Sequence, residues 1–145
     1  MLEDRGDHPG AEGLYREALA RQRADYGDDH EVVGIDLTRI GVVRLLQGAA
    51  GAEPPLREAL EIIRKRLPGN HVRLAEALVP LAGALLAGGR PGEAEPLLRE
   101  ALAIRRAGLG DRAEATREVA RALGRALAAL GRDAEAAPLL AGGGD

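Results

Sequence analysis

The amino-acid sequence predicts an all-α fold built from antiparallel helix pairs. A nine-residue segment occurs three times in nearly identical form, at residues 11–19, 52–60 and 94–102, in steps of 41 and 42 residues. Between these copies, apolar residues recur three and four positions apart, which is typical of a helix with one buried face. Glycine, aspartate and asparagine separate the helical stretches, and no alternating strand pattern competes with them.

Seven helices are expected in a single domain that spans residues 1–145. The first helix stands alone, and three helix pairs follow it. The repeated segment lies in the lone helix and in the second helix of each pair, where the last copy is shortened. In chain order, the expected helices cover residues 10–25, 30–48, 52–66, 71–88, 92–107, 112–130 and 133–141.

Turn chemistry marks where the longer helices begin and end. Equivalent turns at 26–30, 67–71 and 109–113 precede these helices, and their Asp and Asn residues are expected to cap the helix that follows. Glycine closes each of the same helices, because it readily adopts the positive φ that a helix C-terminus often needs.

The spacing within each pair resembles that of the tetratricopeptide repeat (TPR). The pattern is large, x2, large, small, x2, large, then Ala-x3-large-x2-Ala. In the middle pair it falls on Leu78, Leu81, Ala82, Leu85, Ala94, Leu98 and Ala101. The period of about 42 residues instead of 34, and the segment 14–30, resemble the kinesin-light-chain-type subfamily. This resemblance implies a right-handed TPR-type α-solenoid, in which first helices line a concave groove and second helices form the convex back.

Small residues are expected where the two helices of a pair cross closely, and Gly41, Ala82 and Gly124 occupy that place. Pro80 is unusual because it stands within a first helix, where it removes one backbone donor at a cost of about 3 kcal/mol. Either the helix at 71–88 kinks there, or this position marks drift in a decaying repeat.

The composition excludes several classes of protein. There is no Cys, so disulfides and thiolate metal sites are excluded, and there is no Ser for a serine triad. The formal net charge of −3 argues against binding of nucleic acid or of anionic membranes. The acidic first residues lack the apolar stretch of a signal peptide, and no apolar run is long enough for a membrane span. A soluble cytoplasmic protein is expected, and the dominance of Arg over Lys suggests a GC-rich, bacterial genome.

Catalytic, metal and cofactor sites are not expected. His30 and His71 stand in equivalent turns, but equivalent positions on neighbouring helices lie about 8–10 Å apart, too far to share one ion. Capping and packing are therefore favoured over a metal site for both. The remaining nucleophile candidates have no His within reach by helical spacing; they are Tyr15, Tyr26, Thr38, Lys65 and Thr116. Glu and Arg alternate along the second helices, as on a solvated helix face.

The resemblance places the candidate binding residues on the first helices. The predicted groove residues are Thr38, Arg39, Val42, Leu45, Val79, Leu86, Arg121 and Arg125. In peptide-binding relatives, consecutive Asn residues clamp the peptide backbone, and this chain has other residues at those places. An apolar strip and an Arg-bearing end remain. The alternative for Arg121 and Arg125 is that they pair with Glu118 and Glu114 along their own helix.

The sequence thus predicts a non-enzymatic protein–protein interaction module that binds a peptide or protein segment in its groove. The alternative is a structural or regulatory arm, part of a longer repeat array, that packs on its own effector domain or self-associates through exposed solenoid ends. Fold alone does not decide between these roles. Neither role needs a cofactor, a nucleic acid or a membrane.

Overall fold

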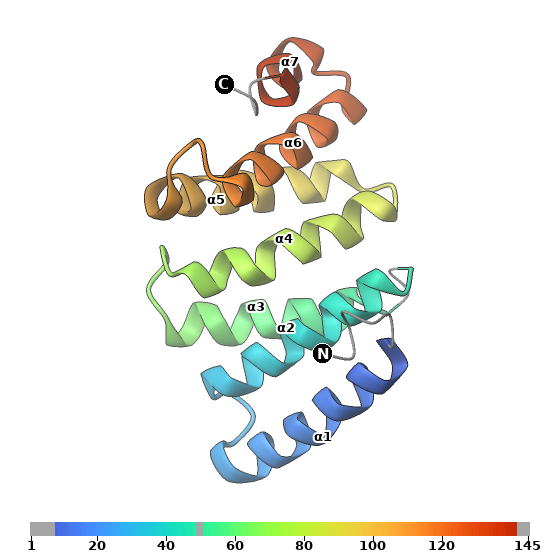
Figure 1. Ribbon diagram of the computed structural model, residues 1–145, viewed down its shortest axis with the longest axis vertical. Coiled ribbons are helices and arrows are strands. Elements are labelled where there is room, and N and C mark those ends of the chain that lie inside the picture. The colour runs from blue at the N-terminus through green and yellow to red at the C-terminus, as the bar shows by residue number, and fades with distance from the viewer. Residues whose placement is uncertain (1–7, 49–50, 142–145) are drawn as a thin grey trace. The chain divides into compact units, whose positions relative to one another are not determined.

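The computed structural model describes residues 8–48 and 51–141, which form seven α-helices and contain no strand (Figure 1). The acidic first residues, which carried the argument against a signal peptide, lie outside these ranges. Every helix end lies within two residues of the end expected from the sequence, so the all-α prediction is confirmed. The helices are α1 (His8–Tyr26), α2 (Glu31–Leu46), α3 (Glu53–Arg66), α4 (Val72–Ala87), α5 (Pro91–Leu109), α6 (Glu114–Ala129) and α7 (Asp133–Ala141).

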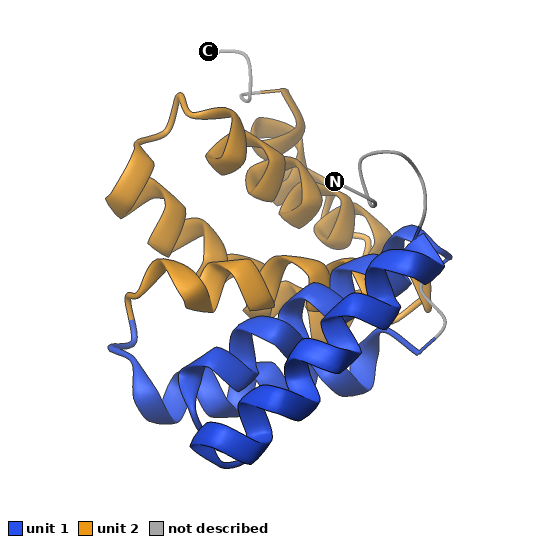
Figure 2. Ribbon diagram, turned by 60° about the horizontal axis from the view of Figure 1, so that its bottom comes forward, with its two compact units in different colours: residues 1–69 blue, residues 70–145 orange. Residues whose placement is uncertain are grey.

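The helices belong to two compact units (Figure 2). Unit 1 comprises residues 1–69, and within it α2 packs against both α1 and α3. Unit 2 comprises residues 70–145, where α5 packs against α4 and α6, and α7 packs against α6. Helices that follow one another in the chain are therefore neighbours inside each unit. That residues 1–145 form one solenoid stays a prediction.

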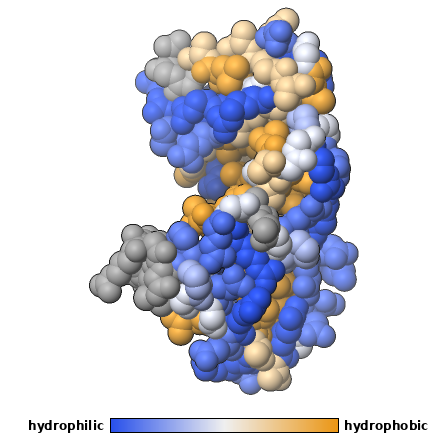
Figure 3. Space-filling model, turned by 90° about the vertical axis from the view of Figure 1, so that its right-hand side faces the viewer, coloured by the Kyte–Doolittle hydropathy of each residue, from blue (hydrophilic) through white to orange (hydrophobic). Residues whose placement is uncertain are grey.

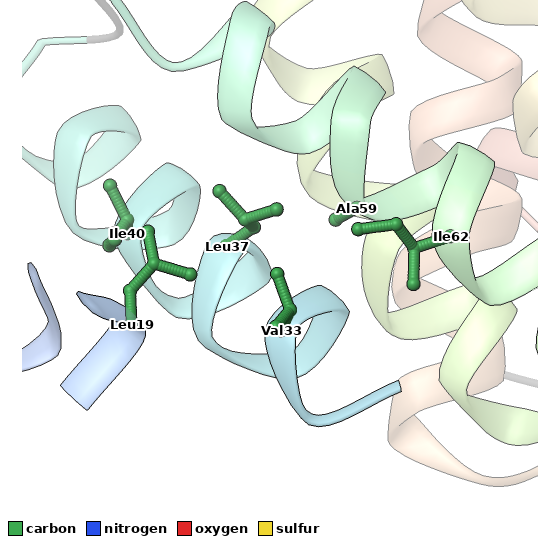
Figure 4. Packing of buried hydrophobic residues seen from close by; sticks show 6 residues of the cluster. All are labelled: Leu19, Val33, Leu37, Ile40, Ala59 and Ile62. Carbon is green, nitrogen blue, oxygen red and sulfur yellow. The ribbon is translucent and has the colours of Figure 1, made fainter. Parts of the chain in front are cut away.

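The core of unit 1 is aliphatic, because the chain has no Phe or Trp to fill it. Three residues of α2, spaced three and four positions apart, form one apolar face that meets side chains of both neighbouring helices. Tyr15 of α1 packs against the edge of this cluster. The cluster, shown in Figure 4, consists of Leu19, Val33, Leu37, Ile40, Ala59 and Ile62.

In unit 2 the same spacing buries leucines of three helices. The largest side chains with almost no exposed surface in α4, α5 and α6 are Leu74, Leu78, Leu81, Leu85, Leu98, Leu123 and Leu127. Pro80 lies inside α4, which continues through it without interruption from Val72 to Ala87. The proline therefore does not end the helix.

Two glycines mark the closest helix crossings. A Cβ at Gly41 would overlap the side chain of Leu56 on α3. A Cβ at Gly124 would lie 2.8 Å from Leu140 Cγ and 3.3 Å from the carbonyl oxygen of Ala136, both on α7. The prediction that small residues are needed at these two crossings is confirmed.

Histidine caps the first helix of two repeats. His30 Nδ1 accepts a hydrogen bond from the backbone N–H of Val32 at 3.2 Å, and His71 Nδ1 accepts one from that of Arg73 at 3.1 Å. The expectation that Asp or Asn caps these helices is wrong, because the helices begin after the histidines rather than earlier. In the third repeat the N-cap is Ala113, which makes no side-chain capping bond.

The helix ends follow the expected glycine pattern. Gly89 after α4 has φ 73° and Gly131 after α6 has φ 78°. These left-handed residues let the chain turn back and satisfy the last helical carbonyls, for example through the bond from Arg132 N to Leu127 O at 2.9 Å.

Candidate functional site

The predicted groove residues lie on three helices and divide between the two units. Those of unit 1 are all on α2, and those of unit 2 are on α4 and α6, which contact each other. The members on α2 are Thr38, Arg39, Val42 and Leu45, those on α4 are Val79 and Leu86, and those on α6 are Arg121 and Arg125.

On α2, the predicted groove residues include a hydroxyl that already donates a hydrogen bond and two half-buried aliphatic side chains. Thr38 Oγ1 donates to the carbonyl oxygen of Gly34 at 2.8 Å, so the hydroxyl proton is used in a hydrogen bond within α2. Val42 and Leu45 lie four and seven positions further along and are half-buried. Their spacing places all three on one side of α2.

Arg39 is held in position while its charged group stays accessible. Its guanidinium lies over the ring of Tyr15 on α1, 5.9 Å from the ring centroid. Its Nη1 is 3.6 Å from Asp36 Oδ1, and the side chain is 54% exposed. The ring and the carboxylate therefore both restrain the guanidinium.

Asp36 is a buried carboxylate that sequence reasoning missed. The residue is 5% exposed, and its Oδ2 has no hydrogen-bond partner within the described residues. Burial raises the pKa of this carboxyl above its ordinary value, and the nearby Arg39 charge opposes that rise. Alignment of the repeats could have indicated that Asp36 is buried. The residues equivalent to Asp36 in the other two repeats are Ala77 and Val119, which are apolar and buried.

The α4 and α6 faces supply the apolar strip and the charged end of unit 2. Val79 and Leu86 are half-buried on α4, seven positions apart and so on one side of it. Arg121 Nη2 lies 3.2 Å from Glu114 Oε1 on its own helix. Arg125 is exposed and makes no ion pair within the part of the chain that the structure describes. Pairing along the helix is thus found for Arg121 and not for Arg125.

Arg132, in the turn between α6 and α7, links α5 and α7 of unit 2 through ion pairs. Arg132 Nη1 donates to both carboxylate oxygens of Glu95 on α5, at 2.8 and 2.9 Å. The same guanidinium binds Glu135 on α7 through Nε at 2.7 Å and Nη2 at 2.9 Å. The hydrogen bonds from Arg132 hold the pKa of Glu135 below its usual range. Arg99 pairs with Glu95 at 2.9 Å.

These contacts give the charged residues a structural role. Hydrophilic residues predominate on the face drawn in Figure 3, and hydrophobic residues form separate patches among them.

Among the described residues, no group of three His, Asp or Glu side chains could hold a metal ion. No helix in the described part of the chain is long and apolar enough to cross a membrane.

Comparison with known proteins identifies the repeat. A family model described as tetratricopeptide repeat matches residues 45–107 and 73–141, and a second model with the same description matches residues 1–31. No curated protein matches the chain significantly.

Among solved structures, the fold is similar to a Podosopora anserina kinesin light chain with nearly identical TPR-like repeats. The TM-score is 0.72 at 26% sequence identity, and the match covers 96% of this chain and 66% of that chain. This chain therefore spans just under two thirds of that relative. A structure of a variant of the same protein matches with a TM-score of 0.48 at 21% identity, over 96% of this chain and 86% of that chain.

Proposed function

This chain belongs to the tetratricopeptide-repeat family, and we propose that it is a non-enzymatic module that binds a peptide or protein segment on its first helices. Its all-α fold and its repeats of kinesin-light-chain type are those of a protein-interaction scaffold. A fold by itself does not define a ligand. The chemistry of the partner is therefore inferred from the side chains on the surfaces of α2, α4 and α6. The net charge of −3 favours a protein partner over nucleic acid. We also propose that the protein acts in the cytoplasm.

The observation that carries the proposal is the arginine pair on α6. Arg121 and Arg125 are one helical turn apart, and like charges at this spacing cost a few tenths of a kcal/mol, about as much as an opposite pair gains. Arg121 has one contact to Glu114, and Arg125 has no ion pair among the described residues. A carboxylate from a ligand would relieve the repulsion, and guanidinium groups hold carboxylates bidentately.

The apolar side chains define the rest of the proposed ligand. On α4, Val79 and Leu86 offer a half-buried aliphatic strip, and on α2, Arg39 stands beside Val42 and Leu45. A peptide with an acidic residue and an aliphatic anchor matches either face. The affinity is expected in the micromolar range, because the Asn backbone clamp of peptide-binding relatives is absent and each tenfold loss is about 1.4 kcal/mol.

The test uses a random peptide library as the probe, followed by titration of the selected peptides. Selected sequences should be rich in Asp or Glu next to Leu, Ile or Val. Arg121→Glu combined with Arg125→Glu should weaken binding at least tenfold, about 1.4 kcal/mol. Arg106→Glu is the control, since this exposed arginine of α5 pairs with Asp111 away from the proposed face. Selection of neutral peptides, or unchanged binding by the folded double variant, would contradict the proposal.

A second candidate is a structural or regulatory arm that packs on an effector domain or on another copy of the chain. The observation in its favour is that both the first and the last described helix expose a large apolar side chain: Leu14 of α1 is 55% exposed and Leu140 of α7 is 43% exposed. Sedimentation of the wild type against Leu14→Glu and Leu140→Glu tests this role. A strict monomer at high concentration counts against self-association.

A further inference from the structure

α1 covers the apolar face of α2 but buries few apolar side chains of its own. Of its 19 residues, Ala11 and Leu19 are buried. α3, which also packs against α2, buries five of its 14 residues. Leu19 lies beside Ile40 of α2 in the cluster of Figure 4, and Tyr15 packs against the edge of that cluster. Apolar burial is the main term that holds packed helices together, so it holds α1 less firmly than α3.

Polar contacts supply much of the remaining attachment. Glu12 Oε1 of α1 accepts a hydrogen bond from Arg44 Nε of α2 at 3.1 Å and lies 3.0 Å from Nη2 of the same guanidinium. Arg23 Nη2 of α1 donates to Glu58 Oε2 of α3 at 2.6 Å. The side chains of Arg23 and Glu58 are 34% and 44% exposed, so salt screens their attraction. The attachment of α1 therefore depends in part on ionic strength.

Arg44 stands where the other two repeats have a buried leucine. Its equivalents in the repeat register are Leu85 and Leu127, each 1% exposed. In place of an apolar contact, the Arg44 guanidinium binds Glu12 and donates to the carbonyl oxygen of Gly51 at 3.0 Å. At this point the contact between α1 and α2 has changed from an apolar one to a charged one.

The turn after α1 lets the helix move as a unit. Gly27 follows α1 directly and has φ 87°, a left-handed conformation that glycine adopts without strain. Hinges are a few residues at the ends of elements that absorb changes in backbone angles. α1 can therefore swing about Gly27 while α2 and α3 stay packed together.

We propose that α1 is a displaceable strap, a helix that covers a docking face on α2 and can leave it. The docking face consists of Val33, Leu37 and Ile40, and Arg44 of the same helix supplies its polar contact. When α1 leaves, the face takes a helix from a partner protein with the chemistry of α1. That helix carries a leucine for the apolar face and, about two turns before it, a glutamate for Arg44.

The copy of this pattern in unit 2 is packed in the same way. Glu95 and Leu102 of α5 are the equivalents of Glu12 and Leu19. Glu95 accepts hydrogen bonds from Arg132, and Leu102 is 4% exposed. A leucine and a glutamate at this spacing are thus sufficient for a helix to combine one buried apolar contact with one arginine contact. α1 and α2 belong to unit 1, so the proposal does not depend on peptide binding at α6.

Opening of the strap is measured by thiol labelling, because the chain has no Cys and one introduced thiol reports on one place. Ile40→Cys puts the thiol in the docking face. Ile63→Cys is the matched control, since the Ile63 side chain lies 3.2 Å from a Cβ at Gly34, between α2 and α3. The Ile40→Cys variant should be labelled at least about tenfold faster than the control, and faster still in about 0.5 M than in about 0.05 M salt.

Arg44→Gln in the Ile40→Cys chain should raise the labelling rate severalfold and make it less dependent on salt. Equal labelling rates of the Ile40→Cys and Ile63→Cys variants would overturn the proposal, because the face would then open only when the whole unit unfolds. A rate in the Ile40→Cys variant that does not change with salt or with Arg44→Gln would also overturn it.

Displacement is tested with a fluorescent peptide of residues 8–26 as the probe. Leu19→Asp in the whole chain weakens the attachment of its own α1, so this variant should bind the wild-type peptide at least about tenfold more tightly than the wild-type chain does, in which the tethered helix competes. A peptide that carries Leu19→Asp should bind neither chain. Absence of binding by the Leu19→Asp chain, with its other helices intact by circular dichroism, would overturn the proposal, as would equal binding of the two peptides.

Discussion

The side chain of Leu56 occupies the space that a Cβ at Gly41 would need, which sets how closely α2 and α3 cross. Leu56 is fully buried, so it has no open space into which it can move. The repeat in unit 2 has Ala82 in the corresponding place, and Leu98 is the counterpart of Leu56 in the repeat register. The crossing in unit 1 is thus built for a residue without a side chain.

Gly41→Ala should destabilise the protein by about 1–3 kcal/mol, the usual cost of overpacking. Part of that loss is offset, because alanine favours a helix over glycine by about 0.5–1 kcal/mol. Urea denaturation followed by circular dichroism measures the difference in the free energy of unfolding.

The matched control is Gly13→Ala in the interior of α1. Apart from its chain neighbours and the backbone of its own helix, no atom lies within 4 Å of a Cβ at Gly13. Only the helix preference then acts, and this variant should gain about 0.5–1 kcal/mol. Equal stabilisation of both variants would refute the role of Leu56.

Gly124→Ala should be milder than Gly41→Ala. The obstructing side chain is Leu140, which is 43% exposed near the end of α7 and can rotate away. The carbonyl oxygen of Ala136 at 3.3 Å is less able to move. We expect a net loss below about 1 kcal/mol once the helix preference is included. A loss as large as that of Gly41→Ala in the same urea titration would show that α7 is held rigidly.

The helices and their crossings could be predicted because they depend on local rules. Apolar spacing and glycine at the turns fix the helix ends, and the repeat register identifies Gly41 and Gly124 as crossing points. The capping residue was assigned wrongly because turns rich in Asp suggest an Asp cap. The backbone instead becomes helical one residue after His30 and His71.

The environment of single charged groups could not be predicted, because it depends on which side chains neighbouring helices supply. Nothing in the sequence distinguishes Arg39 from the other arginines of the predicted groove, whereas the structure places it over Tyr15 and beside Asp36. Arg132 lies in a turn, and only the packing of α7 brings it to Glu95. The groove assignments of the sequence stay predictions.

Asp36→Ala should stabilise unit 1 by about 1–3 kcal/mol at neutral pH, because it removes a buried acceptor without a partner. Alanine fits this place, since the equivalent Ala77 is completely buried. Asp25→Ala is the control at an exposed position of α1, where a change within about 0.5 kcal/mol is expected.

The gain from Asp36→Ala should depend on pH. Burial raises the pKa of Asp36 in the folded protein above the ordinary value of 3.8 that applies to the unfolded chain. The folded state then binds the proton more tightly, so wild-type stability falls as pH rises from 3.8 through the folded pKa. Denaturation of both proteins across this range should show the difference vanishing on the acidic side. A constant difference would mean that the charge of Asp36 is not the cause.

Arg132→Ala should loosen α7 from α5 without unfolding unit 2. The variant loses the bonds from Nη1 to both oxygens of Glu95 and the bidentate contact to Glu135, while Arg99 still pairs with Glu95. α7 has nine residues, too few for a stable isolated helix, so its amides should lose protection severalfold in hydrogen exchange. The effect should shrink in high salt, because exposed ion pairs are screened.

The control for Arg132 is Arg73→Ala, which removes a pair of the same i, i+3 spacing, to Glu76, within α4 alone. It should leave α7 protection unchanged, because no second helix is joined there. The pKa of Glu135 gives a second measure: the hydrogen bonds from Arg132 lower it, so that carboxyl should titrate at higher pH in Arg132→Ala than in the wild type. Because the lowered pKa makes the pair stabilising above the unfolded value, the wild type should lose this advantage as pH falls through the folded pKa of Glu135. Equal α7 protection in Arg132→Ala and the wild type at low salt would show that packing on α6 and the remaining pair of Arg99 with Glu135, at 3.6 Å, are enough to hold the helix.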